Sequence, residues 1–326
     1  MFGSRKRRDI ASVFAALVTR GYNLLQCTVV RPLAEGRLFF LVFFSGHRRD
    51  GDLIQYLEWT DALITPIPID LAIDGTWGNA LDCNLWADLI VARKVLGCHC
   101  GPPCETYSDA RWLEIEEAAV RCLPRPLRSW FHGWGMPSRS FKEAQQTFTG
   151  SRLMMVSITY LLLIYLYGGC GSLEHPRGKA PHKDHWSVWC SSLIRRLTQS
   201  VDWQILSFLQ GPLGVSYAKP TRMLCMRLPT LPKQVFGRYQ KGWKATETLG
   251  GKEECGSWRT AKAKVYPPKL CKAMTEAYLD FWSGCETAGS TEQPEMLETA
   301  LNALTGFWDP YVETTKGNMM AKDYHG

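Results

Sequence analysis

The stretch Val95-Leu96-Gly97-Cys98-His99-Cys100-Gly101-Pro102-Pro103-Cys104 decides how this chain of 326 residues is organised. Its first six residues are mostly apolar or small and precede a glycine, so they predict a short buried strand that ends at Cys100. Two prolines then fix the direction of the backbone before Cys104. The sequence therefore predicts a buried strand, followed by a rigid loop that presents one thiol.

The same alternation of strands and helices continues on both sides of this loop. Residues 38–44 are continuously apolar and predict a strand covered on both faces, which is typical of a parallel sheet. Further strands are predicted at residues 68–73 and 171–173, and helices at residues 10–20, 53–60, 85–93, 141–148, 153–167 and 296–304. This pattern predicts an α/β fold with a doubly wound, mostly parallel sheet.

The charge of the chain is unevenly distributed. The formal net charge is only +7, but the segment 219–272 contains 13 basic and 3 acidic residues. Such an excess is typical of a surface that binds phosphates, although a solvated charged face is the commoner reason for lysines. Within this excess we expect Lys241, Lys244 and Arg259 to contact nucleic acid.

Cysteine usage favours a reducing compartment. The 12 cysteines show no paired Cys-x-x-Cys pattern, and no amino-terminal signal peptide is visible. The run Arg5-Lys6-Arg7-Arg8 is typical of a nuclear address or a phosphate contact. The apolar residues 153–167 are fewer than the roughly 20 needed to cross a bilayer. We expect a nuclear or otherwise intracellular protein that does not associate with membranes.

Metal binding is not expected at the cysteine-rich strand. Consecutive strand residues point to opposite faces, so Cys98 and Cys100 cannot share a metal ion with His99.

The loop from Gly101 to Cys104 resembles motif IV of the DNA cytosine-5 methyltransferases, which use S-adenosylmethionine. Leu173-Glu174-His175-Pro176 is similar to motif VI of that family, and Arg222 lies where its motif VIII would be. The resemblance implies that Cys104 is the nucleophile and that Glu174 hydrogen-bonds the cytosine ring. It also implies that Arg222 braces the base.

The cofactor-binding motifs of that family have counterparts near the other strands. Phe44-Ser45-Gly46 looks like motif I, which turns beneath the methionine part of S-adenosylmethionine, and residues 259–273 resemble motif X. Asp82 resembles the adenine-contacting aspartate of motif III, and it also suits an N-cap.

Two further positions complete the expected cofactor site. Either Asp70 or Asp74 is expected to hydrogen-bond the ribose, since an acidic residue at that strand end does so in dinucleotide-binding sheets. The resemblance also implies that Pro102, on the motif IV loop, lies beside the cofactor.

The order of these motifs implies a Rossmann-like methyltransferase fold with a small basic insert. We expect a basic leader and helix at 1–30, a catalytic core at 31–218, a recognition-like region at 219–258, a return to the core at 259–285 and a polar tail at 286–326.

The resemblance implies transfer of a methyl group from S-adenosylmethionine to C5 of cytosine in DNA, through a Cys104 adduct. Two alternatives stay open. The first is a catalytically inactive, methyltransferase-like protein that binds nucleic acid. The second is an RNA cytosine methyltransferase, since nothing in the residues distinguishes ribose from deoxyribose.

Overall fold

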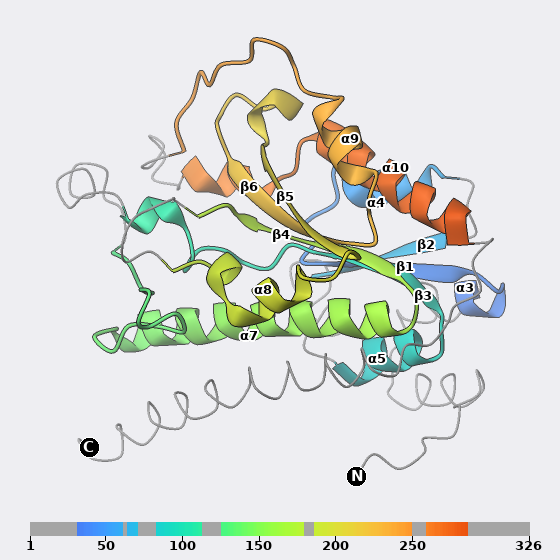
Figure 1. Cartoon of the computed structure of the whole chain (residues 1–326), viewed down its shortest axis with the longest axis horizontal. Helices are drawn as coiled ribbons and strands as arrows, with labels where there is room; N and C mark the ends of the chain where they lie inside the picture. Colours follow the sequence, from blue (N-terminus) through green and yellow to red (C-terminus); the bar gives the residue numbers. More distant parts are fainter. Residues whose placement is uncertain are drawn as a thin grey trace.

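A computed structural model of the chain describes residues 31–60, 64–70, 83–112, 125–178, 186–249 and 259–285. Within them six strands form one sheet in the order β2-β1-β3-β4-β6-β5 (Figure 1). The strands are β1 (Leu38–Phe43), β2 (Ile64–Ile69), β3 (Val95–Cys100), β4 (Cys170–Pro176), β5 (Trp203–Leu209) and β6 (Pro220–Met226).

The sheet is mixed but mostly parallel. β1 pairs in parallel with both β2 and β3, and β3 pairs in parallel with β4. β6 runs antiparallel to both of its neighbours, β4 and β5. The predicted α/β architecture is confirmed, whereas β5 and β6 follow the last strand that the sequence predicted.

Helices cover both faces of the sheet, as Figure 1 shows. One face packs against α5 (Cys83–Val91), α7 (Phe141–Leu166) and α8 (Ser192–Leu197). The other packs against α4 (Leu53–Glu58), α9 (Leu231–Phe236) and α10 (Pro268–Cys285). The remaining short elements are α3 (Arg31–Ala34), η2 (Asp109–Trp112), η3 (Val188–Cys190), η4 (Gly211–Leu213) and η5 (Arg259–Lys264).

The continuously apolar sequence of β1 serves both helical layers. Phe39, Leu41 and Phe43 join the core cluster beneath α7, while Phe40 and Val42 join the cluster beneath α10. Successive residues of a strand point to opposite faces, and helices cover both faces of the sheet. All five side chains are therefore buried. The prediction of a strand covered on both faces is therefore confirmed.

The strand predicted at 68–73 is misplaced, since β2 spans Ile64–Ile69. Pro66 and Pro68 lie inside the strand rather than at its start. Alternate residues of a strand direct their backbone nitrogens to the same side, so the nitrogens of both prolines point the same way. Since proline has no N–H to donate, this is the side away from β1, the one strand that pairs with β2 among the described residues. Proline is tolerated there because an outer edge needs no N–H donor.

The two helices predicted at 141–148 and 153–167 form one helix, α7, of 26 residues. Ser140 and Glu143 begin it with a capping box. Gly150 lies between the predicted halves, and glycine suits this position because a Cβ atom there would lie 2.9 Å from the Thr106 hydroxyl. By length and composition α7 could cross a membrane, yet 67% of its most apolar window is buried inside the protein.

Gly97 is required where β3 meets β4. A Cβ atom at Gly97 would lie 2.5 Å from the Cys170 carbonyl oxygen and 2.9 Å from the Phe40 ring. We expect Gly97→Ala to lower the free energy of unfolding by about 1–3 kcal/mol, because backbone on one side cannot yield. Urea unfolding measures this. Gly284→Ala in α10, with open space around the added methyl group, is the control and should not destabilise the protein. Equal stability of the two variants would contradict this packing.

Candidate functional site

The carboxyl ends of four parallel strands meet at one rim of the sheet. Phe43 pairs with Ile69 and with Cys100, and Cys100 pairs with Leu173. The residues that follow these positions are Phe44, Asp70, Gly101 and Glu174. Ligands of open α/β sheets bind at this kind of rim.

The loop after β3 brings Cys104 to this rim. Pro102 is buried and Cys104 is half-buried, and the carbonyl of Cys104 accepts a hydrogen bond of 2.9 Å from the Tyr107 nitrogen. Burial raises the pKa of the Cys104 thiol to about 12, and Lys219 opposes that rise while Glu174 adds to it. Cys104 therefore lies within electrostatic reach of both a cation and the predicted glutamate.

Glu174 is almost enclosed, with 6% of its surface exposed. Its Oε1 atom accepts from Lys219 Nζ at 3.2 Å and from Gln210 Nε2 at 3.3 Å. Its Oε2 atom accepts from the Tyr266 hydroxyl at 3.1 Å. Three donors from separate segments of the chain thus fix the position of the Glu174 carboxylate.

A chain of hydrogen bonds continues from Tyr266 into the core. The Tyr266 oxygen is 3.2 Å from His99 Nε2, and His99 Nδ1 is 2.8 Å from the Ser172 hydroxyl. The Ser172 hydroxyl is in turn 2.6 Å from that of Tyr278. Burial, followed by the charge of Lys219, lowers the pKa of His99 to about 3, so the ring is neutral. Because Tyr266 donates its proton to Glu174, we assign the imidazole hydrogen to Nε2.

Glu174 is contacted by Lys219, whereas Arg222, which is expected to brace the base, lies elsewhere on the same segment. Arg222 lies on β6 opposite His175, and its Nε atom donates to the Ser207 hydroxyl at 3.2 Å. Lys219 is the residue that sequence reasoning missed. Its only signal was its position in the same Lys-Pro-Thr-Arg stretch, just before the strand begins.

The turn after β1 is strained and open. Phe44 has φ +61°, which is uncommon for a residue with a side chain, and Gly46 has φ +68°. The Gly46 nitrogen donates to Asp70 Oδ2 at 2.9 Å, and a Cβ atom on Gly46 would meet nothing within 4 Å. Phe44, Ser45, Gly46 and Asp70 thus lie together at the rim, while the predicted Asp74 and Asp82 lie outside the described residues.

The predicted recognition-like region, residues 219–258, begins inside the sheet, because β6 occupies Pro220–Met226. Lys241 and Lys244 are exposed on the loop after α9, and the half-buried Arg259 begins η5. Several other cations of the 219–272 segment are paired with acids: Arg227 with Asp202, Arg238 with Glu276, Lys262 with Glu247, and Lys264 with Glu105.

Two aromatic residues of this region, Tyr239 and Trp243, hold its backbone in place. The Tyr239 hydroxyl bonds both the nitrogen and the carbonyl of Leu209, at 2.8 and 3.0 Å. Trp243 packs on Gly211 and donates to the Val215 carbonyl at 3.0 Å. These rings are therefore occupied in holding the loop to the sheet.

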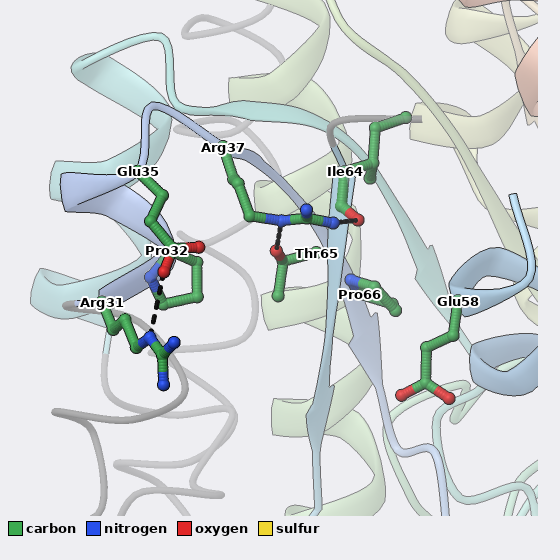
Figure 2. Close-up of a pocket in the computed structure, with 8 residues that line it drawn as sticks. All are labelled: Arg31, Pro32, Glu35, Arg37, Glu58, Ile64, Thr65 and Pro66. Atoms are coloured by element: carbon green, nitrogen blue, oxygen red, sulfur yellow. Dashed lines mark hydrogen bonds and ion pairs between the residues drawn. The ribbon is translucent and has the colours of Figure 1, made fainter. Parts of the chain in front are cut away.

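A shallow pocket of about 360 Å³ lies at the opposite ends of β1 and β2 (Figure 2). Arg37 crosses it and donates to the Thr65 hydroxyl at 2.8 Å and to the Ile64 carbonyl at 2.9 Å. The Arg37 guanidinium joins the beginning of β1 to that of β2. Because Cys104 lies at the other ends of the strands, this pocket is separate from the rim that carries Cys104.

Comparisons with known proteins do not assign the chain to a family. A scan against protein-family models finds no match, and a search of curated proteins finds none either. The functional argument therefore depends on the fold and on the geometry of the rim.

The charges around Cys104 predict its reactivity. Iodoacetamide should modify Cys104 slowly at pH 8 in the folded protein, because the raised pKa leaves little thiolate. Lys219→Met should slow the reaction further, since it removes the favourable cation, whereas Glu174→Gln should speed it. Mass spectrometry of the Cys104 peptide measures the rate, and the urea-unfolded chain is the control. Identical rates in the three folded proteins would contradict this electrostatic environment.

His175 predicts how stability depends on pH. Burial, then Arg128 and Lys219, lowers the pKa of His175 to about 3, and neither ring nitrogen has a hydrogen-bond partner among the described residues. Below pH 6.5 the unfolded chain takes up a proton that the folded chain does not, so stability falls as pH falls toward 3.

We expect His175→Phe to remove about 1.4 kcal/mol per pH unit from the slope of unfolding free energy between pH 6 and 4. Chemical denaturation at several pH values measures the slope, and replacement of the exposed His132 by Asn is the control. An unchanged slope in His175→Phe would show that this ring titrates normally.

Proposed function

We propose that this chain transfers a methyl group from S-adenosylmethionine to C5 of cytosine in DNA, through a covalent adduct at Cys104. The observation that carries the proposal is the strand register, which brings the loop of Cys104, the end of β4 with Glu174 and the 44–46 turn to one rim of the sheet. A nucleophile, a carboxylate that can hydrogen-bond a base and an open strand-to-helix turn are the parts that this reaction needs.

The sheet supports a methyltransferase-type fold as the finer assignment. β6 is a reversed strand that lies between β4 and β5, at one end of an otherwise parallel sheet. This mixed, mostly parallel sheet is compatible with the Rossmann-like fold that the motif resemblance implies. The similarity concerns topology, so the activity still has to be argued from the residues at the rim.

The open turn after β1 fits a bound cofactor. The space beside Gly46 is clear, and Asp70 already holds the Gly46 nitrogen, so the turn is preformed. Ser45 and Gly46 would lie beneath the cofactor, which supplies an electrophilic methyl group when it is bound. Pro102, on the neighbouring loop, would cover its other side.

The residues of the chain would activate the base. C5 of cytosine is a poor nucleophile, so Cys104 first loses its thiol proton to water. The thiolate then adds at C6, and the electron pair of the C5–C6 bond moves toward C5 and N3. When Glu174 is protonated, its carboxyl group donates a hydrogen bond to N3 and stabilises that charge. After C5 is methylated, a base removes the C5 proton and the C6–sulfur bond breaks, which returns its electron pair to Cys104. The target base must first leave the stack.

The structure shows one state of these residues, in which Tyr266 and Lys219 occupy Glu174. A base reaches the carboxylate only after at least one of these donors moves.

A fluorinated substrate tests the proposal. An oligonucleotide that contains 5-fluorocytosine should form a covalent adduct with the chain in the presence of S-adenosylmethionine, since fluorine at C5 cannot leave as a proton does. Denaturing gel electrophoresis detects the adduct, and Cys104→Ser should abolish it. The buried Cys225, replaced by Ser, is a matched control that should keep the adduct. An adduct that persists in Cys104→Ser would overturn the assignment of the nucleophile.

The enclosure of Glu174 by three donors favours, as a second candidate, a protein that binds nucleic acid without catalysis. That candidate predicts salt-dependent binding that Cys104→Ser leaves unchanged, and a melting temperature that S-adenosylmethionine does not raise. Parallel measurements with DNA and RNA oligonucleotides of one sequence distinguish a DNA substrate from an RNA substrate.

A further inference from the structure

Two large aromatic side chains are exposed side by side on a tight turn. The backbones of Ser129 and His132 bond each other in both directions, at 3.0 and 3.3 Å, and between them Trp130 is 52% and Phe131 82% exposed. Adjacent aromatic residues seldom remain in water at the tip of a rigid turn unless they contact a partner.

This turn, residues 129–132, is attached to the Cys104 loop by Arg128. Arg128 is 1% exposed, and its guanidinium bonds the Thr106 hydroxyl at 2.9 and 3.2 Å. It also donates to the Gly133 carbonyl, the Ser151 hydroxyl and the Thr147 carbonyl. Because Thr106 is two residues beyond Cys104, the turn with the exposed aromatic pair is joined to the loop that carries the candidate nucleophile.

The surroundings of the turn are positively charged. Residues 125–142 contain no acidic residue and four basic ones, of which Arg128 is buried and the others are Arg125, Arg139 and Lys142. Glu143 neutralises Arg125, but Lys142 is exposed and Arg139 donates to the uncharged Met136 carbonyl. Aromatic rings beside cations are the combination that binds single-stranded nucleic acid, because bases stack on the rings while cations hold the backbone.

We infer that Trp130 and Phe131 form a stacking surface for unpaired nucleobases next to the Cys104 loop. The inference rests on the proposed function for the class of its partner, and it moves the contact with bases away from the basic segment. Tyr239 and Trp243 in that segment already bond the backbone of their own domain, whereas the aromatic pair on the 129–132 turn faces solvent.

Binding of fluorescein-labelled single-stranded DNA and RNA to the full chain tests the inference. Trp130→Ala combined with Phe131→Ala should weaken binding about tenfold or more, because stacking is lost. The slope of log affinity against log salt should stay unchanged, since no phosphate contact is removed. Lys142→Ala should instead reduce that slope.

Trp59→Ala is the matched control, because Trp59 is also a highly exposed tryptophan but follows α4 in the other helical layer. This variant should bind as the unaltered chain does. Thermal unfolding checks that all variants are folded. We expect that they are, because the replaced side chains are exposed.

The outcomes separate this inference from the proposed function. If the double variant binds single strands as tightly as the unaltered chain, the inference of a stacking surface is wrong, while the proposed reaction at Cys104 is not affected. If the chain binds no single strand but binds vesicles that contain anionic lipid, and the double variant loses vesicle binding, the turn contacts membranes and the inference fails. If stacking is seen but no 5-fluorocytosine adduct forms, the inference holds and the catalytic proposal fails.

Discussion

The parallel register of β1, β3 and β4 is the constraint on which the rest of the molecule depends. Each strand is buried on both faces, so a slip of one residue would send side chains selected for one helical layer into the other. The register therefore fixes where each strand ends, and through that the positions of the 44–46 turn, the Cys104 loop and Glu174. The geometry of the rim is a result of core packing.

The polar chain from Glu174 to Tyr278 adds a second constraint. Buried hydrogen-bonding groups are costly unless all of them are paired, and here five side chains satisfy one another in sequence. Removal of a single member deprives each of its neighbours of one hydrogen-bond partner. Such a network tolerates one arrangement well and neighbouring arrangements poorly, so it orients Glu174 more strictly than apolar packing alone would.

The sequence predicted those features that depend on local pattern. β3 has the bounds expected from its apolar residues and from Gly101, and β1 differs by a single residue. Features that depend on pairing between distant segments were not predictable in this way. Motif position drew attention to Arg222 and not to Lys219, whereas the contact of Lys219 with Glu174 depends on where the antiparallel strand begins. α7 was divided at Gly150, because a close approach of Thr106 leaves no periodic signal.

The prolines of β2 affect how the molecule behaves at high concentration. An exposed strand edge is a template on which a neighbouring molecule can build, but Pro66 and Pro68 withhold two of the N–H groups that such growth requires. β5, at the other end of the described sheet, contains no proline. Addition of a strand from another molecule is therefore opposed at the β2 edge of the described sheet. An ordered aggregate of folded molecules would have to begin at the β5 edge.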